Sequence, residues 1–303
     1  MQLDKMTQLG MPEVVFENAS MKEKAAFRDY EILSPRQATV VNHYRMMRQN
    51  QTLDFVQRMH AKYSFADGQH RCVMSIQDAF RKLDGYVDSS DPDLSLPNII
   101  HSYQTAEALR KAGKPDWMQL IGLIHDMGKL MFLWGEACDG QQGTAEGPQW
   151  ALGGDTFVVG AKLPDCCVFP EFNSLNPDSH NPERNTELGI YTPQCGLQNV
   201  LFAYGHDEYL YQMLVANGCT IPPEGYYMVR FHSAYPWHTG GAYSSLINAH
   251  DLEMLPHVLE FNKFDLYTKD ELGQLSREQG DALWPHYHAI IQKYFPDPEN
   301  LKW

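Results

Sequence analysis

The chain lacks the features that mark nucleic-acid-binding and membrane proteins. Its 303 residues contain no run rich in Lys and Arg, and the formal net charge is -14, so we expect no nucleic-acid partner and no anionic membrane surface. No apolar stretch approaches the ~20 residues that a membrane-spanning helix needs. The first residues also lack the apolar core of a signal peptide. We therefore expect a cytoplasmic protein.

Cysteine is scarce and irregularly placed. The six cysteines form no C-x-x-C pair with zinc-site spacing and no regular framework, so we interpret them as reduced thiols. The sequence has neither a G-x-G-x-x-G nor a P-loop pattern, the signatures of the commonest nucleotide-binding loops, and it shows no internal repeat. Its length suits one large domain as well as two modest ones.

Helical patterns dominate the sequence on both sides of a loop-rich middle. Apolar residues predict a long helical stretch from about Ala38 to His60. Pro97 and Pro115 each predict the start of a helix, because proline fits the first helical turn. Helical patterns return from about Thr186 to Tyr294. Within this last stretch we expect breaks at four prolines: Pro222, Pro223, Pro236 and Pro256.

The middle of the chain has a different composition. Residues 137–147 contain several Gly and few apolar residues, which predicts an exposed loop. Residues 150–172 are β-prone around Gly and Pro, which predicts a short β-hairpin. Residues 1–24 have the composition of a loosely attached tail, and we expect residues 25–303 to form one domain. The predicted fold is mostly α, a single helical bundle with a short β-hairpin in the middle.

The segment LIGLIHDMGK is the most informative part of the sequence. Its helix is apolar apart from the adjacent His125 and Asp126 and the following Lys129, and burying such a pair without a partner is costly. Four other segments place a His or Asp in similarly apolar, aromatic surroundings: His101 in NIIHSYQTAE, His206 in AYGHDEYLY, His232 in VRFHSAYPWH and Asp265 in FNKFDLYTK. Together these segments supply four imidazoles and two carboxylates, which are enough for two metal ions. The absence of a thiolate favours iron, manganese or zinc.

Helix geometry constrains how such a site is built. We expect His125 and Lys129 to share a helix face, because they are four residues apart, whereas Asp126 points ~100° away from His125. His125 and Asp126 therefore do not easily hold one ion between them. A carboxylate has two oxygens that can serve two ions, and we therefore expect Asp126 to bridge a metal pair. Asp207 repeats the dyad after His206, and both a helix-terminal charge and an acceptor for a ligating imidazole fit it. Read singly, the other histidines fit ordinary surface or hydrogen-bonded roles: His43, His60, His70, His180, His238, His250, His257, His286 and His288.

The same segments resemble a known family. The order of His101, the dyad and a distant Asp265 is similar to the HD-domain superfamily, a helical fold of mostly metal-dependent phosphohydrolases. The segments FRDY, DSSDPD, LIHDMGK, GHDEY, RFHSAYPWHTG and FNKFDLYTK more narrowly resemble the myo-inositol oxygenase family, from about Ala25 to Trp303. The resemblance implies an HD-domain-like helical fold. It also implies a mixed-valent Fe(II)/Fe(III) pair that cleaves the ring of myo-inositol with dioxygen to give D-glucuronate.

The resemblance also implies roles for individual residues. The implied iron ligands are His101, His125, Asp126, His206, His232 and Asp265, with Asp126 bridging and Lys129 as the catalytic side chain. The implied substrate contacts are Arg28, Asp88, Ser89, Ser90, Lys129, Gly154, Asp155, His232 and Ser233. Two departures from the family pattern stand out, a longer loop at 137–147 and Ser89 where an acidic residue is common. We expect a monomer that acts on a small polyol, myo-inositol.

Two other functions stay open on the sequence. An HD-type phosphohydrolase would use a metal-bound hydroxide at the same dyad. Its site would be expected to surround the metals with Arg and Lys, whereas the candidate contacts here are largely acidic or hydroxylic, which suits a neutral polyol. A catalytically silent metal-binding protein is the third possibility, because a fold alone does not imply an activity. The intact set of ligand residues argues against it.

Overall fold

The structure is a computed structural model that describes residues 36–91, 97–143, 147–271 and 277–303. The expected tail at 1–24 and the candidate contact Arg28 lie outside the described residues. Within the described ranges the protein is mostly helical, as the sequence predicts, and its paired strands are limited to one short antiparallel pair. None of the helices in these ranges is both long and apolar enough to cross a membrane.

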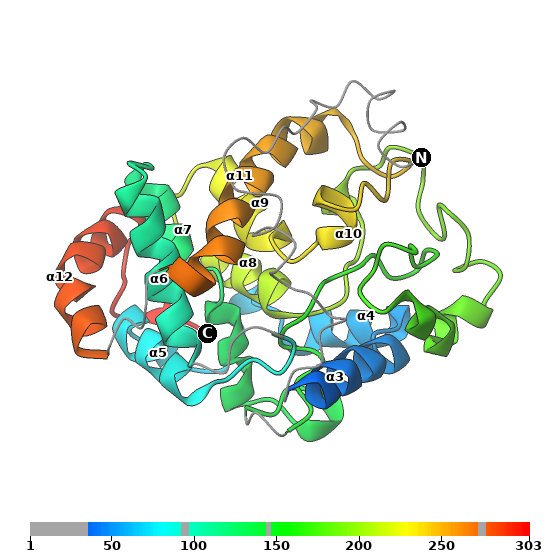
Figure 1. Ribbon diagram of the computed structural model, residues 1–303, viewed down its shortest axis with the longest axis horizontal. Helices are drawn as coiled ribbons and strands as arrows, with labels where there is room; N and C mark the ends of the chain where they lie inside the picture. Colours follow the sequence, from blue (N-terminus) through cyan, green and yellow to red (C-terminus); the bar gives the residue numbers. More distant parts are fainter. Residues whose placement is uncertain (1–35, 92–96, 144–146, 272–276) are drawn as a thin grey trace.

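Figure 1 shows the helices and strands, coloured in the order of the chain. The α-helices are α3 (Gln37–Asn50), α4 (Leu53–Lys62), α5 (Ile76–Lys82), α6 (Asn98–Lys111), α7 (Asp116–Ile124), α8 (His206–Ala216), α9 (Pro223–Phe231), α10 (Tyr235–His238), α11 (Ala249–Glu271) and α12 (Arg277–Tyr294). The 3-10 helices are η1 (Ala66–Gly68), η2 (Leu83–Gly85), η3 (Met127–Leu133), η4 (Ala137–Asp139), η5 (Pro170–Leu175), η6 (Pro177–His180) and η7 (Leu197–Asn199). The strands are β1 (Val73–Met74) and β2 (Leu301–Lys302).

Helices α6 and α7 lie side by side and form the most extensive helix pair, with α12 along their outer side (Figure 1). Leu109 on α6 and Leu120 and Leu123 on α7 are fully buried between these elements. Each such side chain contributes about 1.5–3 kcal/mol of burial free energy. A Cβ on Gly122 would come 2.6 Å from Leu109 Cδ1, so glycine allows the close approach of the two helices. This pairing fixes His101 relative to the dyad.

A second apolar core lies on the other side of the molecule, where α3 and α4 pack against the long segment that follows η4 (Figure 1). Val40 and Val56 on these helices are fully buried with Phe157 and Leu152 from that segment. Because Leu152 immediately precedes Gly153, this core holds the 153–155 segment in place. The second core therefore positions part of the candidate substrate site.

The predicted helix boundaries hold in part. Helices α6 and α7 begin directly after Pro97 and Pro115, as predicted. The predicted 38–60 helix is wrong as one piece, because it is interrupted at Gln51 and Thr52. Thr52 caps the new helix by accepting a hydrogen bond from Phe55 N at 3.2 Å, which favours the restart.

Two expectations for the C-terminal half are also wrong. Helix does not resume near Thr186, since residues 186–205 form turns and η7, and α8 begins at His206. Pro256 does not break its helix but lies inside α11. Packing of α11 against α6 and α9 outweighs the loss of one backbone hydrogen bond at the proline.

The expected β-hairpin at 150–172 is wrong. Within this segment only Val158 pairs, in an isolated antiparallel bridge with Phe202. The two-stranded sheet instead joins β1 to β2, with Val73 opposite Lys302 and Met74 opposite Leu301. Local composition indicates extended backbone at 150–172, but it does not identify the distant partner that pairs with it.

The 137–147 segment is less exposed than its composition indicates. Asp139 and Gln141 are buried, and the carboxylate of Asp139 pairs with Lys62 while the Gln141 side chain accepts a hydrogen bond from Tyr63. Residues 144–146 lie outside the described part of the chain. The first half of this loop is therefore anchored on the second core.

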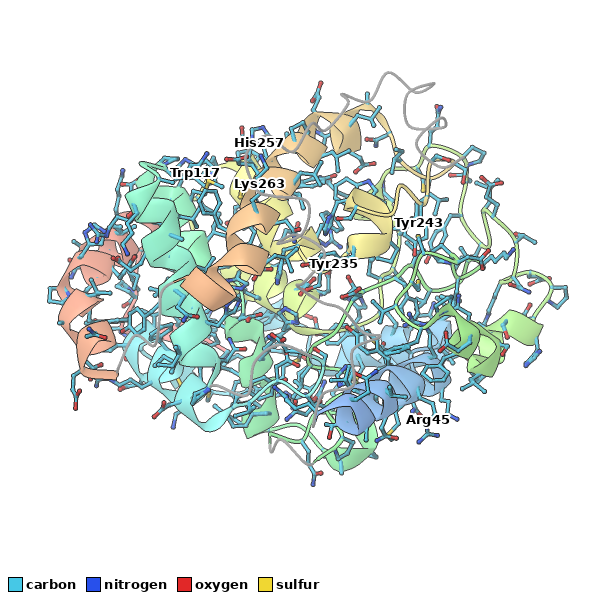
Figure 2. All side chains as sticks on the ribbon, in the orientation of Figure 1. Arg45, Trp117, Tyr235, Tyr243, His257 and Lys263 are labelled. Atoms are coloured by element: carbon cyan, nitrogen blue, oxygen red, sulfur yellow. The ribbon has the colours of Figure 1, made fainter. Side chains whose placement is uncertain are left out.

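Tyrosine hydroxyls tie the loops around α10 to the rest of the molecule (Figure 2). Tyr235 accepts a hydrogen bond from Asn262 Nδ2 on α11 at 2.8 Å, and Tyr243 accepts one from the backbone N–H of Val158 at 3.0 Å. Because α10 begins three residues after His232, these bonds help to fix the end of α9.

Candidate metal centre

The side chains singled out by the sequence converge at the centre of the molecule. Each is at most 9% exposed. Helix α6 provides His101, and α11 supplies Asp265. Helix α7 ends just before the dyad, α8 begins at His206, and α9 ends just before His232. We call these residues the His/Asp cluster: His101, His125, Asp126, His206, His232 and Asp265.

Backbone carbonyls fix three of the imidazoles. The Nδ1 atoms of His125 and His232 lie 3.0 Å and 2.9 Å from the carbonyl oxygens three residues earlier, in the last turns of α7 and α9. His206 Nδ1 lies 2.6 Å from Leu152 O. A carbonyl oxygen only accepts, so each Nδ1 donates and each Nε2 points into the cluster. This is the arrangement by which a protein orients metal-binding histidines.

The two oxygens of Asp126 face two different groups of histidines. Oδ1 lies 3.2 Å from His206 Nε2 and 4.0 Å from His232 Nε2. Oδ2 lies 3.5 Å from His125 Nε2. The carboxylate therefore stands between two sets of donor atoms, as a bridging ligand must.

Each set brings further donor atoms together. On the Oδ2 side, Asp265 Oδ1 lies 2.9 Å from His101 Nε2 and 3.4 Å from His125 Nε2. His125 Nε2 is buried and has no hydrogen-bond partner among the described residues. On the Oδ1 side, the Nε2 atoms of His206 and His232 are 3.1 Å apart. Ligand atoms of His101, His125 and Asp265 lie within 4.8 Å of one another, and so do those of His206, Asp207 and His232; a third such group, His125, Asp126 and His232, joins the two sides.

The electrostatics of the cluster favour bound cations. Burial raises the pKa of both Asp126 and Asp265. Lys129 and the imidazoles of His125 and His206 outweigh it at Asp126, and His101 and His125 outweigh it at Asp265, so both carboxyl pKa values lie well below their usual range. Burial lowers the pKa of His206, yet the neighbouring carboxylates, Asp207 first, raise it to about 9. The carboxylates around His206 therefore stabilise positive charge at this position. Oxygen and nitrogen donors without thiolate suit iron, manganese or zinc.

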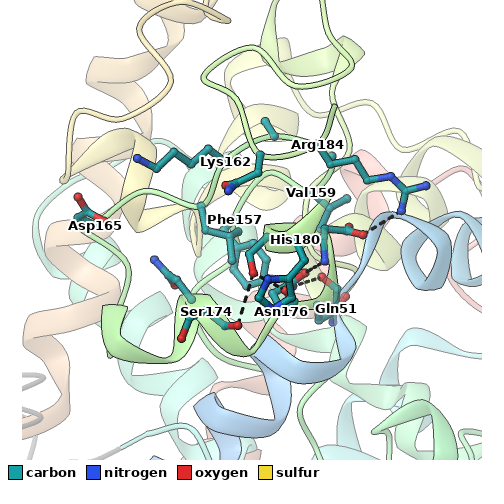
Figure 3. Close-up of a pocket in the computed structure, with 16 residues that line it drawn as sticks. Gln51, Phe157, Val159, Lys162, Asp165, Ser174, Asn176, His180 and Arg184 are labelled. Atoms are coloured by element: carbon teal, nitrogen blue, oxygen red, sulfur yellow. Dashed lines mark hydrogen bonds and ion pairs between the residues drawn. The ribbon is translucent and has the colours of Figure 1, made fainter. Parts of the chain in front are cut away.

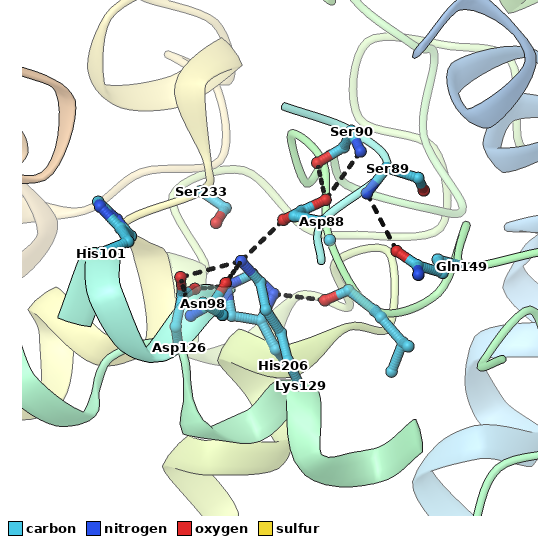
Figure 4. A network of polar contacts seen from close by, with 12 residues as sticks. Asp88, Ser89, Ser90, Asn98, His101, Asp126, Lys129, Gln149, His206 and Ser233 are labelled. Carbon is cyan, nitrogen blue, oxygen red and sulfur yellow. Dashed lines mark hydrogen bonds and ion pairs between the residues drawn. The ribbon is translucent and has the colours of Figure 1, made fainter. Parts of the chain in front are cut away.

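Lys129 joins the His/Asp cluster to a nearby acidic turn (Figure 4). Its Nζ lies 2.8 Å from Asp88 Oδ2, 2.9 Å from Asp126 Oδ2 and 3.1 Å from Asn98 Oδ1. Burial lowers the pKa of Lys129, but Asp126 and Asp88 outweigh it and raise the pKa above its usual value. Lys129 is therefore an ammonium group that donates hydrogen bonds.

The sequence placed Lys129 on the face of His125, and this expectation is wrong. Helix α7 ends at Ile124, and the chain continues as the 3-10 helix η3, in which residues three apart share a face. Lys129 consequently stands over Asp126. In η3 a Cβ on Gly128 would come 2.0 Å from His206 O, so glycine permits the backbone contact that brings the dyad to α8.

The candidate substrate contacts form a wall beside the cluster. We call this group the acidic wall: Asp88, Ser89, Ser90, Gly154, Asp155 and Ser233. The His206 ring donates to Leu152 O, and Thr156 N donates to Ser233 O at 2.8 Å. Gly154 and Asp155 lie between these two contacts along the chain. The wall is therefore attached to both α8 and the end of α9.

Asp88 is anchored within its own turn. Its Oδ1 accepts hydrogen bonds from Ser90 N at 2.8 Å and Ser90 Oγ at 2.7 Å, while Oδ2 accepts from Lys129. Burial raises the pKa of Asp88, but Lys129 outweighs it and keeps the pKa well below its usual range. The Asp88 carboxylate is therefore ionised, and its hydrogen bonds fix its orientation.

Sequence reasoning missed Asn98 and left Asp207 open. Asn98 Nδ2 donates to Asp126 Oδ2 at 2.9 Å, and its position three residues before His101 on α6 could have indicated the shared face. Asp207 Oδ1 lies 2.7 Å from His206 Nε2 and accepts from Ser233 Oγ at 3.2 Å. Asp207 lies in the first turn of α8, as the helix-terminal reading expects, but its carboxylate contacts Nε2, the inward-facing nitrogen of His206, where a further metal ligand would stand.

A separate cavity of about 290 Å³ lies away from the cluster and contains none of its residues (Figure 3). Its polar side chains already serve the fold. Arg184 pairs with Asp178 at 2.8 Å and Asp54 at 3.0 Å, and Asn176 Nδ2 donates to Gln51 O at 3.0 Å. We assign no chemistry to this cavity.

The fold is a helical core, and its buried imidazoles and carboxylates form two sets of possible metal ligands. These features define a class of protein, the helical metal-binding proteins whose metal centre has nitrogen and oxygen ligands. The sequence profile of the family described as myo-inositol oxygenase matches residues 37–303. The chain belongs to the myo-inositol oxygenase family.

Named relatives extend over nearly the whole chain. It is 47% identical to the inositol oxygenase of Mus musculus over 286 residues, which covers 93% of this chain and 92% of the relative. It is 48% identical to that of Danio rerio over 282 residues, 91% of this chain and 93% of the relative. Inositol oxygenase 4 of Arabidopsis thaliana is 44% identical over 278 residues, which covers 91% of this chain and 82% of the relative.

Proposed function

We propose that this chain is a di-iron oxygenase that cleaves the ring of myo-inositol with dioxygen and releases D-glucuronate and water. Family membership and the names of the relatives support the substrate and the reaction type. One structural observation carries the metal part of the proposal. The two oxygens of Asp126 face two separate sets of inward-pointing donor atoms, which suits a bridged metal pair better than a single ion.

The proposed ligands divide between the two ions. His101, His125 and Asp265 would hold one ion, His206 and His232 would hold the other, and Asp126 would be shared by both. Two irons held by these residues would supply the redox chemistry that uses dioxygen. The nitrogen and oxygen donors fit iron, and three buried carboxylates near the site, those of Asp126, Asp265 and Asp207, offset the charge of the ions.

Lys129 has a defined part in this proposal. Its raised pKa keeps the ammonium protonated, so it donates a hydrogen bond to a substrate oxygen and does not act as a base. Its three contacts already account for its three N–H bonds. A substrate oxygen therefore replaces one of them. The neutral carbonyl oxygen of the Asn98 amide is the weakest partner, because hydrogen bonds to charged acceptors are stronger.

The acidic wall is proposed to bind the ring hydroxyls. The Ser233 hydroxyl donates to Asp207 beside His206, so it lies near the proposed second ion. The Asp155 carboxylate is buried and accepts a hydrogen bond from Tyr44 OH at 3.4 Å. Gly154 has φ of +91° and exposes its backbone without a side chain. Arg28 remains a proposed contact outside the described residues, as does the domain start near Ala25.

The acidic wall also argues against a phosphate ester as substrate. Among the described residues, the cation that contacts the cluster is Lys129, and two carboxylates already neutralise it. Among the described residues, a phosphate group beside Lys129 would meet the Asp88 carboxylate, so charge repulsion would disfavour it.

The deciding experiment is oxygen uptake by the iron-loaded protein. We expect one dioxygen consumed and one D-glucuronate formed for each myo-inositol, with two irons bound per chain. Metal analysis that finds one tightly bound zinc would exclude the iron pair. Phosphate release from nucleotides without oxygen uptake would replace this proposal with the phosphohydrolase.

A further inference from the structure

His43 is a buried histidine outside the His/Asp cluster. It lies on α3 and is 4% exposed. Its Nδ1 is 2.9 Å from Ser89 Oγ and its Nε2 is 3.2 Å from Gly153 O. One imidazole thus contacts two segments that are far apart in the sequence, and each of them carries a carboxylate of the acidic wall.

The two partners determine the proton positions on the ring. Gly153 O only accepts, so His43 Nε2 carries a proton and donates it. Burial lowers the pKa of His43 to about 4, and the neutral ring then leaves Nδ1 as an acceptor. The Ser89 hydroxyl therefore donates to His43. This commits the proton of Ser89 to the protein, so Ser89 offers a substrate only its lone pairs.

Close packing joins the same groups. A Cβ on Gly154 would come 2.9 Å from His43 Nε2, and one on Gly153 would come 2.7 Å from Asp88 Oδ2. The His43 ring therefore packs against the backbone at Gly154, and the Asp88 carboxylate packs against the backbone at Gly153. Because no side chain separates them, a shift of the ring moves both parts of the wall.

Other side chains hold the backbone around Asp88. Gln149 accepts from Ser89 N at 3.0 Å and donates to Val87 O at 3.2 Å, and Arg36 donates to Asp88 O. The Gln149 contacts tie the turn to the chain four residues before Gly153. His43 is the side chain that ties this turn to the Gly153 carbonyl.

We propose that His43 is a positioning residue that sets the distance between the Asp88 turn and the Gly154–Asp155 segment, and so determines how tightly the polyol is held. The proposal rests on the proposed function for the identity of the ligand. The hydrogen bonds and packing around His43 carry it, and they include no member of the His/Asp cluster.

The test compares four variants as iron-loaded proteins. His43→Ala removes both hydrogen bonds, His43→Gln keeps an N–H for Gly153 O, and Ser89→Ala removes only the other bond. Gln49→Ala changes an exposed residue on the same helix and is the matched control. We expect His43→Ala to raise KM for myo-inositol about tenfold while kcat stays within about threefold and two irons remain bound. His43→Gln recovers most of this loss, and Gln49→Ala matches the parent.

A double variant and hydrogen exchange make the test specific. Adding Ser89→Ala to His43→Ala costs less than the sum of the single changes, because both remove the same bond. Backbone hydrogen exchange in His43→Ala accelerates at both 87–90 and 153–156, without any substrate present. A change at one segment alone, or an unchanged KM with parent-like exchange, would overturn the positioning role.

Failure of the proposed function gives a different result. In that case the parent itself neither binds nor oxidises myo-inositol, as calorimetry and oxygen uptake report. The hydrogen-exchange comparison still decides whether His43 couples the two segments, and a negative result there overturns the proposal independently.

Discussion

The His/Asp cluster and the acidic wall adjoin each other but are built in different ways. In the cluster, histidines stand at helix ends or within helices, and three of them are oriented by backbone carbonyls. In the wall, carboxylates stand on turns whose positions depend on side chains from α3 and from Gln149. The orientation of the cluster is therefore secured largely by the main chain, whereas that of the wall is secured by replaceable side chains. Substitutions in the cluster should therefore change the metal content, whereas substitutions in the wall should change the affinity for the substrate.

The largest effect is expected at Asp126, where both sets of donor atoms meet. Asp126→Ala should reduce bound iron from two to at most one per chain and lower turnover by more than the roughly 10–100-fold typical of residues that only orient metal ligands. Metal analysis measures the bound iron, and oxygen uptake measures the turnover. Glu253→Ala, which alters an exposed carboxylate on α11, is the control. Two irons retained in Asp126→Ala would remove the bridging role.

Asp155 tests the wall without touching the cluster. Asp155→Ala should weaken myo-inositol binding by about 1.5–3 kcal/mol, the range for a hydrogen bond to a charged group. The irons should stay bound. Calorimetry with myo-inositol and with inorganic phosphate is the measurement, and the exposed Asp165→Ala is the matched control. Unchanged inositol binding together with improved phosphate binding would contradict the oxygenase assignment.

Asn98 stands where the two regions meet, because its amide contacts both Asp126 and Lys129. Asn98→Ala should lower kcat by about tenfold, since Lys129 and the bridging carboxylate lose a common orienting group. Iron content and kcat are measured together, with the exposed Asn300→Ala as control. Loss of iron with normal turnover per remaining site would assign Asn98 to the cluster alone.

The smallest effect concerns pH and stability at His43. Its pKa is lowered from 6.5 to about 4, with burial as the main cause, Asp88 opposing it and Lys129 and Arg48 adding to it. The unfolded chain therefore binds a proton in this range that the folded protein does not. This contribution to stability is complete above pH 6.5 and falls as the pH drops towards 4.

Replacing the imidazole removes that dependence. Between pH 7 and 5.5, the parent should lose about 1 kcal/mol more unfolding free energy than His43→Gln. Urea unfolding at the two pH values measures the difference. Parallel losses in the two proteins would show that His43 is readily protonated in the folded state.

The sequence predicted what depends on local pattern. Pro97 and Pro115 mark two helix starts correctly, and the apolar setting of the dyad identifies a buried polar site. Patterns that depend on distant partners were not predictable. Val158 pairs with Phe202 instead of forming a hairpin, and β1 pairs with the last strand of the chain.

The same division applies to the site. The residues of the cluster lie in motifs long enough to recognise, and the structure places them together. His43 was assigned an ordinary role because its sequence neighbourhood does not show that Ser89 and Gly153 meet at its ring. Lys129 was assigned to the wrong face because the change from α-helix to 3-10 helix after Ile124 leaves no clear signal in an apolar segment.

The order of the ligands along the chain has a consequence for biosynthesis. His101 and Asp265, whose side chains touch in the folded protein, are 164 positions apart. At translation rates of about 5–20 residues per second, roughly 8–30 s separate their synthesis on the ribosome. During that interval the nascent chain displays the dyad without the last carboxylate and without α11, so a metal captured early would meet an incomplete site. A complete metal site therefore requires that Asp265 has been synthesised and that α11 has packed onto α6.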